Sequence, residues 1–195
     1  MEKMGEALAR EGFFVVNVDY PSSSFSIQEL GDRVIQAIRA DEDIAGSEKI
    51  HFVTHSMGGI LVRSFLERND LPQLGRVVML APPNQGSELV DAMGDWWIFE
   101  AINGAPGQEL GTGPTSTPHR LGPVDFELGV IAGDRSINWI NSMIIDGTDD
   151  GKVSVERTEI DGMSDHVVIH ATHPFIMKNA EAIEKTIQFL KTGAF

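Results

Sequence analysis

The stretch Lys49–Arg63, KIHFVTHSMGGILVR, decides the fold. It opens with a short apolar run typical of a buried strand. After Thr-His-Ser-Met-Gly-Gly it continues with apolar residues at helical spacing. Strand, sharp turn and helix in this order predict that Ser56 stands exposed at the tip of the turn. Gly58 and Gly59 allow the strand and the helix to approach closely, because neither has a side chain.

Strand and helix patterns alternate along the rest of the chain. Apolar runs predict four further strands, at residues 13–18, 76–80, 127–132 and 165–170. Helices are predicted at 1–10, at 27–40 after a Ser26 cap, at 137–143 and after Asn179. This alternation predicts an α/β fold: a mostly parallel sheet of about five to six strands with helices on both faces. Ligands bind such sheets at the carboxyl ends of the strands.

Composition limits the classes of function. A chain of 195 residues with 42% apolar and 23% charged residues suits one globular domain, 1–195. No run reaches the roughly 18 apolar residues of a membrane span, so stable membrane insertion is not expected. The net charge of −14 argues against binding to nucleic acid. The absence of cysteine excludes disulfides and thiolate chemistry, and the N-terminal stretch lacks a signal-peptide pattern, which favours a cytoplasmic location.

The pattern of regular elements breaks down between Ser87 and Pro123. This segment contains the apolar run 95–99 and is otherwise rich in Gly, Pro, Thr and Ser. Long irregular segments in compact domains are usually functional, so we expect a cap over a site at about 87–123. Packing of the same aromatic residues into the core is the alternative. Trp96 and Trp97, together with Tyr20, are predicted to contact the substrate.

The turn around Ser56 resembles the nucleophile elbow of α/β-hydrolases, G-x-S-x-G, with Thr54 in place of the first glycine. The chain is also similar to lipase-like esterases and acylhydrolases of that superfamily at four further segments, which are 19–21, 81–87, 149–151 and 172–175. The resemblance covers nearly the whole chain and implies a shortened α/β-hydrolase fold. It also implies that Ser56 is the nucleophile and that the backbone N–H of Met57, at the start of the helix, binds the oxyanion.

His173 is the predicted base, because it follows the last strand and can reach the elbow. His166 and His170 lie four apart on the preceding strand and are expected to be packed or solvent-facing. His55 is expected to point away from the pocket, and His119 lies in the predicted cap. A metal site of His166, His170 and His173 is disfavoured because residues four apart on a strand diverge by about 13 Å. No metal and no cofactor are expected.

Three aspartates compete for the acidic position. Asp150 is preferred because Asp150-Gly151-Lys152-Val153 resembles the Asp-Gly-x-Val segment that carries the acid in lipase-like hydrolases. Asp134, directly after a predicted strand, is the second choice, and Asp149 is the third.

The resemblance also implies missing parts. Related hydrolases carry a strand between those equivalent to 13–18 and 49–53, and its loop supplies the second oxyanion donor. This chain has no matching segment, so we expect a gap in the sheet or a new pairing. An open apolar strand edge invites pairing with another chain, which predicts a homo-oligomer. The Tyr20–Ser24 loop is a candidate substitute for part of the oxyanion hole.

The predicted function is that of a serine carboxylester hydrolase acting on short to medium acyl esters, which are small-molecule substrates. Two alternatives remain open. An inactive remnant serving as a binding or assembly module is favoured by the missing loop. An acyltransferase or thioesterase would use the same three residues.

Overall fold

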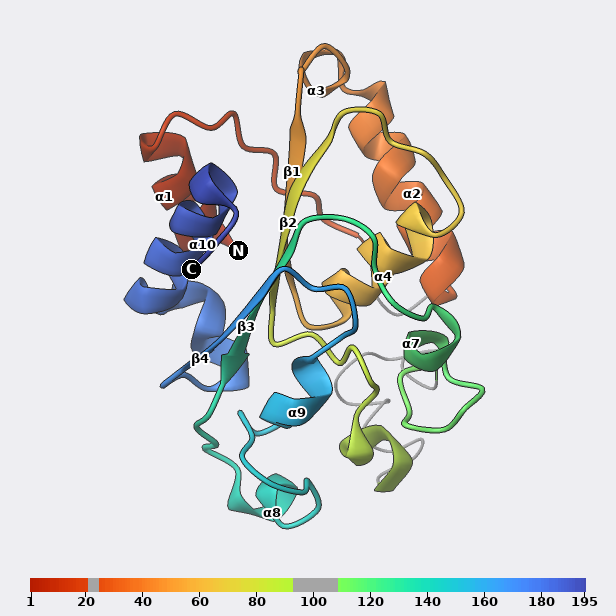
Figure 1. Ribbon diagram of the computed structural model, residues 1–195, viewed down its shortest axis with the longest axis vertical. Helices are drawn as coiled ribbons and strands as arrows, with labels where there is room; N and C mark the ends of the chain where they lie inside the picture. Colours follow the sequence, from red (N-terminus) through yellow and green to blue (C-terminus); the bar gives the residue numbers. More distant parts are fainter. Residues whose placement is uncertain (21–24, 93–108) are drawn as a thin grey trace.

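The computed structural model describes residues 1–20, 25–92 and 109–195. Its sheet has four parallel strands in the order β1-β2-β3-β4. The strands are β1 (Ile50–His55), β2 (Leu74–Leu80), β3 (Leu128–Gly133) and β4 (Asp165–Ile169). All four point in one direction, so their carboxyl ends share the lower edge of the sheet in Figure 1. The predicted α/β class with a parallel sheet is confirmed.

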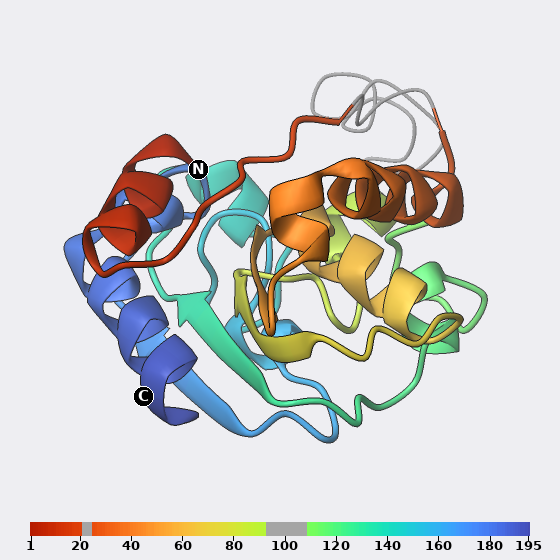
Figure 2. The same cartoon turned by 90° about the horizontal axis from the view of Figure 1, so that it is seen from above.

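Helices cover both faces of the sheet. One face carries α1 (Glu2–Arg10) and α10 (Ala180–Thr192), and the other carries α2 (Ile27–Ala40) and α4 (Met57–Leu66), as Figures 1 and 2 show. Alternate residues of β2 face the two layers: Val78 and Leu80 pack toward α1 and α10, and Val77 and Met79 toward α2 and α4. This period of two follows from the pleat of a strand. It explains why the strands are apolar throughout.

Shorter elements fill the connections. They are α3 (Glu42–Ala45), α7 (Thr117–Arg120), α8 (Trp139–Ser142), α9 (Val155–Thr158) and the 3₁₀ helix η1 (His173–Lys178). The predicted Ser26 cap is confirmed: its hydroxyl accepts from the N–H of Glu29 while the Glu29 carboxylate accepts from the N–H of Ser26. Among the described helices, none is long and apolar enough to cross a membrane.

The strand predicted at 13–18 is not part of the sheet. The segment is extended, but it forms no ladder with any strand in the described ranges. Phe13 and Val15 pack against the α1 and α10 layer, whereas Phe14 and Val16 are 66% and 41% exposed. A ladder requires a neighbour at about 4.8 Å, and β1 is separated from this segment by a cavity. The sheet therefore has four strands within residues 1–20, 25–92 and 109–195, where the sequence predicts five to six.

The predicted cap is only partly described, since 93–108, with Trp96 and Trp97, lies outside the described residues. Its flanks pack on the helical layer: Val90 and Leu110 join a buried cluster with Ile27, Met57 and Leu61. The flanks are thus anchored on α2 and α4 beside the elbow. Whether the segment covers the site remains a prediction.

Gly133, the last residue of β3, brings the end of this strand against the loop after β4. A Cβ atom at this position would lie 2.5 Å from the carbonyl oxygen of Ala171 and 3.0 Å from the Cβ of Asp150. Only glycine permits this approach, which places the loops after β3 and β4 in contact.

We therefore expect Gly133→Ala to lower the free energy of unfolding by about 1–3 kcal/mol, the usual cost of overpacking. The matched control is Gly5→Ala within α1, where the added Cβ would meet only a Val15 methyl at 3.4 Å. It should stabilise by up to about 1 kcal/mol through helix propensity. Urea unfolding measures both. Equal stability of Gly133→Ala and the parent protein would contradict the close approach.

Candidate active site

Ser56 occupies a strained turn between β1 and α4. Its φ of 54° and ψ of −128° lie in a region that residues with a side chain rarely adopt, and such strain costs about 1–3 kcal/mol. The Ser56 N–H donates to the carbonyl of Leu80 at 2.9 Å, which ties the turn to the end of β2. The surrounding structure thus maintains the sharp turn predicted from the sequence.

Of the two glycines that follow Met57, Gly59 is closely packed, whereas a Cβ at Gly58 would be in ordinary van der Waals contact. A Cβ at Gly58 would lie 3.4 Å from the Cβ of Thr54 and 3.7 Å from the Tyr20 hydroxyl, and one at Gly59 would lie 2.9 Å from the Met79 sulfur. Thr54 stands where the elbow pattern has glycine. It faces Gly58, where even an added Cβ would be in ordinary van der Waals contact with it, so the threonine is accommodated without a clash.

Ser56, His173 and Asp150 form one hydrogen-bonded row. The Nε2 of His173 lies 3.0 Å from the Ser56 hydroxyl oxygen, and its Nδ1 lies 2.7 Å from Oδ2 of Asp150. The side chain of His173 is 3% exposed and that of Asp150 is 1% exposed. The structure therefore brings together the three residues that the sequence predicts, from loops after β1, β3 and β4.

Asp150 is fixed by more than its contact with the imidazole. Its Oδ1 accepts from the backbone N–H groups of Lys152 at 3.0 Å and Val153 at 2.9 Å, while Oδ2 faces His173. The N–H of His173 also donates to the carbonyl of Asp150 at 2.9 Å. Both carboxylate oxygens are thus oriented before any substrate binds.

The other two candidate aspartates have different partners. Oδ1 of Asp149 accepts from the Ser142 hydroxyl and from the N–H of Gly151 at 2.7 Å, which shapes the turn. Asp134 contacts Nδ1 of His170 at 2.9 Å, in a pair whose side chains are 34% and 70% exposed. Of the three aspartates, Asp150 is the one whose carboxylate contacts His173.

His55 lies against His173, whereas the sequence predicts that it points away from the pocket. Its Nε2 is 3.0 Å from the carbonyl oxygen of His173, and the two ring centroids are 4.8 Å apart. Burial, followed by the charge of His173, lowers the pKa of His55 to about 3. A neutral His55 can donate its Nε2–H to that carbonyl and support the loop that carries the base. A histidine next to the nucleophile was the only sequence signal for this role.

Two other histidines that the sequence analysis weighed beside His173 form hydrogen bonds away from Ser56. Nε2 of His166 lies 3.0 Å from the Thr158 hydroxyl oxygen, and Nδ1 of His119 lies 3.2 Å from that of Ser116. Burial lowers the pKa of His166. Neither has a hydrogen bond to the Ser56 row.

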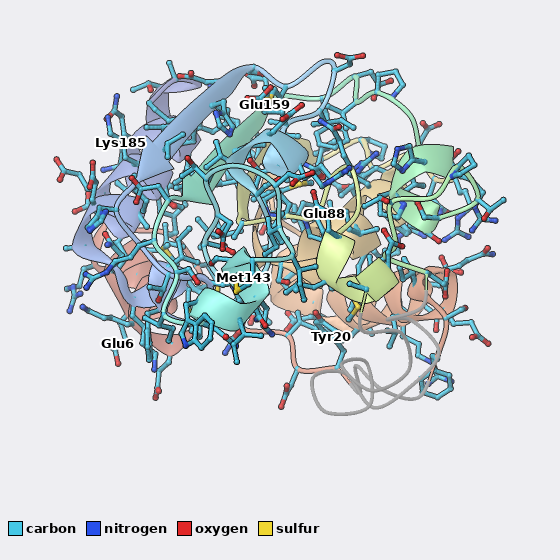
Figure 3. The ribbon with its side chains drawn as sticks, turned by 90° about the horizontal axis from the view of Figure 1, so that it is seen from below. Glu6, Tyr20, Glu88, Met143, Glu159 and Lys185 are labelled. Atoms are coloured by element: carbon cyan, nitrogen blue, oxygen red, sulfur yellow. The ribbon has the colours of Figure 1, made fainter. Side chains whose placement is uncertain are left out.

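The predicted oxyanion and substrate residues are placed as follows. Met57 is the first residue of α4, so its N–H is one of those that a helix leaves without an intrahelical partner. Tyr20 lies beside the elbow near Gly58, and burial, followed by the charge of Asp19, raises its pKa. Figure 3 looks at this carboxyl edge from below and shows Tyr20, Glu88 and Met143 coming from three separate segments. Trp96 and Trp97 fall outside the described residues.

Arg63 is a further residue that sequence reasoning missed. It extends from α4, is 3% exposed, and donates to the backbone carbonyls of Asn84, Pro118 and Gly122 at 2.9–3.0 Å. Burial lowers its pKa to about 10. It thereby joins the elbow helix to the loop after β2 and to the flank of the predicted cap.

Comparison with solved structures identifies the fold. The mature form of the Bacillus licheniformis lipase BlEst2 is similar at a TM-score of 0.79 and 20% identity, over 96% of this chain and 83% of that chain. The phospholipase PlaB from Legionella pneumophila, in complex with thio-NAD, is similar at a TM-score of 0.69 and 16% identity. The similarity covers 97% of this chain and 58% of that chain. A thermophilic esterase from Thermogutta terrifontis is similar at a TM-score of 0.55 and 15% identity, over 98% of this chain and 85% of that chain. No family model and no curated protein matches the sequence.

These similarities show that the chain has the α/β-hydrolase fold, in a lipase-like and shortened form. The sheet, the elbow between β1 and α4, and the Ser-Asp-His order along the chain agree with this assignment.

We expect the titration of His55 to make the free energy of unfolding of the protein depend on pH. Its pKa is about 3 when folded against an ordinary value of 6.5, so the unfolded state binds the proton more readily between these values. The free energy of unfolding should therefore fall as the pH drops below about 6.5, by up to about 1.4 kcal/mol per pH unit. His55→Gln keeps an N–H donor but cannot titrate, so its slope should be shallower.

The measurement is urea unfolding between pH 4.5 and 8. His170→Gln serves as the control because its ring is exposed, and its slope should resemble that of the parent protein. An unchanged slope in His55→Gln would contradict a partly buried, neutral His55.

Proposed function

We propose that this chain is a serine carboxylester hydrolase that acts on short to medium acyl esters through an acyl-serine intermediate. The observation that carries the proposal is the buried row Ser56–His173–Asp150, with distances of 3.0 and 2.7 Å. A hydrolase of the esterase or lipase type is further supported by the neighbours described above, which are a lipase, a phospholipase and an esterase. The chain order Ser, Asp, His is that of α/β-hydrolases.

In the acylation step, Nε2 of His173 accepts the hydroxyl proton of Ser56 as Oγ attacks the ester carbonyl carbon. Asp150 stabilises the resulting imidazolium and holds Nδ1–H in place. The Met57 N–H, at the positive end of α4, donates to the oxyanion of the tetrahedral intermediate. When the intermediate collapses, the carbon–oxygen bond to the alcohol breaks and His173 returns the proton to the leaving oxygen.

Deacylation follows the same proton-transfer steps, with water as the nucleophile in place of Ser56. His173 accepts a proton from the water that attacks the acyl carbon, and then returns a proton to Oγ of Ser56 as the carboxylic acid leaves. No group beyond the protein and water is needed to balance either step. One oxyanion donor typically contributes about 10²–10³-fold in turnover, so the Met57 N–H is a substantial part of the proposed machinery.

The first test is hydrolysis of p-nitrophenyl acetate, butyrate and palmitate. The two short esters should be cleaved, with palmitate the poorest substrate. Ser56→Ala should lower kcat by about 10⁴-fold or more, because no nucleophile remains.

Ser47→Ala provides the control, since the Ser47 hydroxyl donates to the carbonyl of Asp43 beside α3, at the opposite end of β1. It should retain parent activity. Equal rates for Ser56→Ala and the parent protein would overturn the proposed nucleophile.

The acid is tested by a matched pair of substitutions. Asp150→Asn should lower kcat by about 10³–10⁴-fold, because an amide stabilises neither the needed tautomer nor the imidazolium. Asp134→Asn changes the same residue type beside another histidine, His170, on the surface. It should leave kcat within about twofold, since exposed ion pairs contribute little. A loss in Asp134→Asn as large as in Asp150→Asn would reject the assignment.

A further inference from the structure

An apolar surface lies at the end of the molecule to which the four strands point, where Figure 1 shows α8. Among the described residues, eight large apolar side chains are more than 40% exposed, and four of them fall within one stretch of seven residues. These four are Ile137, Trp139, Ile140 and Met143, which are 64%, 71%, 54% and 76% exposed. We call them the α8 patch. Single exposed apolar residues are common, but a group of them marks an interaction surface.

The apolar side chains of α8 face outward, while a polar side chain faces the protein. Asn141 is 8% exposed, and its Nδ2 donates to the carbonyl of Gly151 at 2.9 Å. Residues three or four apart share a face of a helix, so Met143 lies beside both Trp139 and Ile140. A surface helix ordinarily has the reverse orientation, with its apolar face toward the core. The orientation of α8 therefore needs an explanation other than core packing.

α8 is tied to the turn that carries the proposed acid. The carbonyl that Asn141 binds belongs to Gly151, directly after Asp150. The Ser142 hydroxyl donates to Asp149, directly before Asp150, at 3.0 Å. Figure 3 views this edge of the sheet and shows the methionine of the patch on it. Whatever binds the α8 patch is therefore brought to the edge at which the proposed ester hydrolysis takes place.

The patch is uncharged in a strongly acidic protein. Residues 136–145, SINWINSMII, contain no charged side chain, although 23% of the chain is charged and its net charge is −14. That charge repels an anionic surface, and a second copy of the chain carries the same charge. A surface that fits is apolar inside and uncharged outside, as in zwitterionic phospholipid. Trp139 suits this boundary, because its ring is apolar while its indole N–H needs a polar partner.

The shape and the size of the patch disfavour a protein partner. Each of its side chains is more than half exposed, so the patch projects from the protein and forms no groove for a helix or a strand. Four such side chains offer on the order of 500 Å² of surface. Each partner in a stable protein complex buries roughly 800 Å². A lipid surface requires no complementary shape, because acyl chains close around the side chains that enter it.

We propose that the α8 patch adsorbs the protein to the surface of uncharged lipid, so that the site meets esters held at a lipid–water boundary. The consequence for catalysis rests on the proposed function, whereas adsorption is a separate property of the surface. Adsorption needs no spanning helix, since the apolar face of an interfacial helix sinks only about 5–10 Å into the lipid surface.

Adsorption is measured by co-sedimentation with vesicles of a dialkyl ether phosphatidylcholine, which has no ester bond to cleave. The parent protein should sediment with these vesicles. It should sediment at least fivefold less with vesicles of the matching ether phosphatidylglycerol at low ionic strength, because the net charge of −14 is repelled. Trp139→Gln and Met143→Gln should each weaken adsorption at least tenfold, because a side chain that enters the acyl region becomes polar.

Phe14→Gln is the matched control. Phe14 is similarly exposed, at 66%, but lies beside the outer edge of β1, where it lines the cavity between β1 and residues 12–18. The substitution should change adsorption less than twofold. Urea unfolding of the three variants should match that of the parent protein, because each substituted side chain is exposed. A loss of adsorption then reports on the surface and not on unfolding.

A second measurement follows the indole of the patch itself. Replacing Trp96 and Trp97 by phenylalanine leaves Trp139 as the only tryptophan of the chain. Acrylamide should quench its fluorescence in the absence of vesicles. Addition of the ether phosphatidylcholine vesicles should shift its emission to shorter wavelength and reduce the quenching by acrylamide.

Four results would overturn the proposal. Absence of sedimentation with the phosphatidylcholine vesicles would reject a lipid partner, and stronger sedimentation with phosphatidylglycerol would reject an uncharged one. Equal losses in Phe14→Gln and Trp139→Gln would place adsorption elsewhere. Protection of Trp139 from acrylamide without vesicles would show that protein covers the patch: a second copy if light scattering shows a dimer, and another segment of this chain if it shows a monomer. None of these measurements involves an ester, so their failure is distinct from failure of the proposed hydrolase.

Discussion

The contact between Asp150 and His173 is the interaction on which the candidate site depends. It consists of a side-chain hydrogen bond of 2.7 Å and a backbone hydrogen bond of 2.9 Å, so the two loops meet in one orientation. Gly133 makes the contact feasible, because any Cβ there would strike Ala171 and Asp150. The buried pair is thus a consequence of how tightly the ends of β3 and β4 are packed. His55 adds a third support from the end of β1.

Sequence patterns within short stretches predicted two parts of this site, the turn around Ser56 and the position of His173. The strand-turn-helix pattern around Ser56 and the position of His173 after the last strand are properties of short stretches, and both are found as predicted. Among the aspartates, Asp150 is preferred over Asp134 and Asp149 on a resemblance to the Asp-Gly-x-Val segment, and all three lie between β3 and β4. The structure shows which carboxylate faces His173. That orientation depends on the hydrogen bonds that Asp149 and Asp150 accept within their turn, and these are not visible in the sequence.

Features that depend on distant partners were missed. The run at 13–18 has the composition of a strand, yet a strand exists only where a neighbour completes its ladder, and no segment that the structure describes pairs with it. Arg63 reads as an ordinary charged residue on a helix until the carbonyls of Pro118 and Gly122 are found around it. His55 is expected from the sequence to point away from the pocket, and the carbonyl that its Nε2 contacts belongs to His173, 118 residues away.

The outer edge of β1 and the row Ser56–His173–Asp150 lie on different sides of this strand. Two requirements of the proposed chemistry, activation of the nucleophile and stabilisation of the oxyanion, are therefore met by different parts of the fold. Activation of the nucleophile uses loops after β1, β3 and β4, which the intact ladder β1-β2-β3-β4 holds in register. In the proposed mechanism the oxyanion is stabilised at the start of α4, near Gly58 and Tyr20, which also line the cavity between β1 and residues 12–18. In the described part of the chain, the row Ser56–His173–Asp150 is formed by loops that these three strand pairs hold, and none of its hydrogen bonds involves the outer edge of β1.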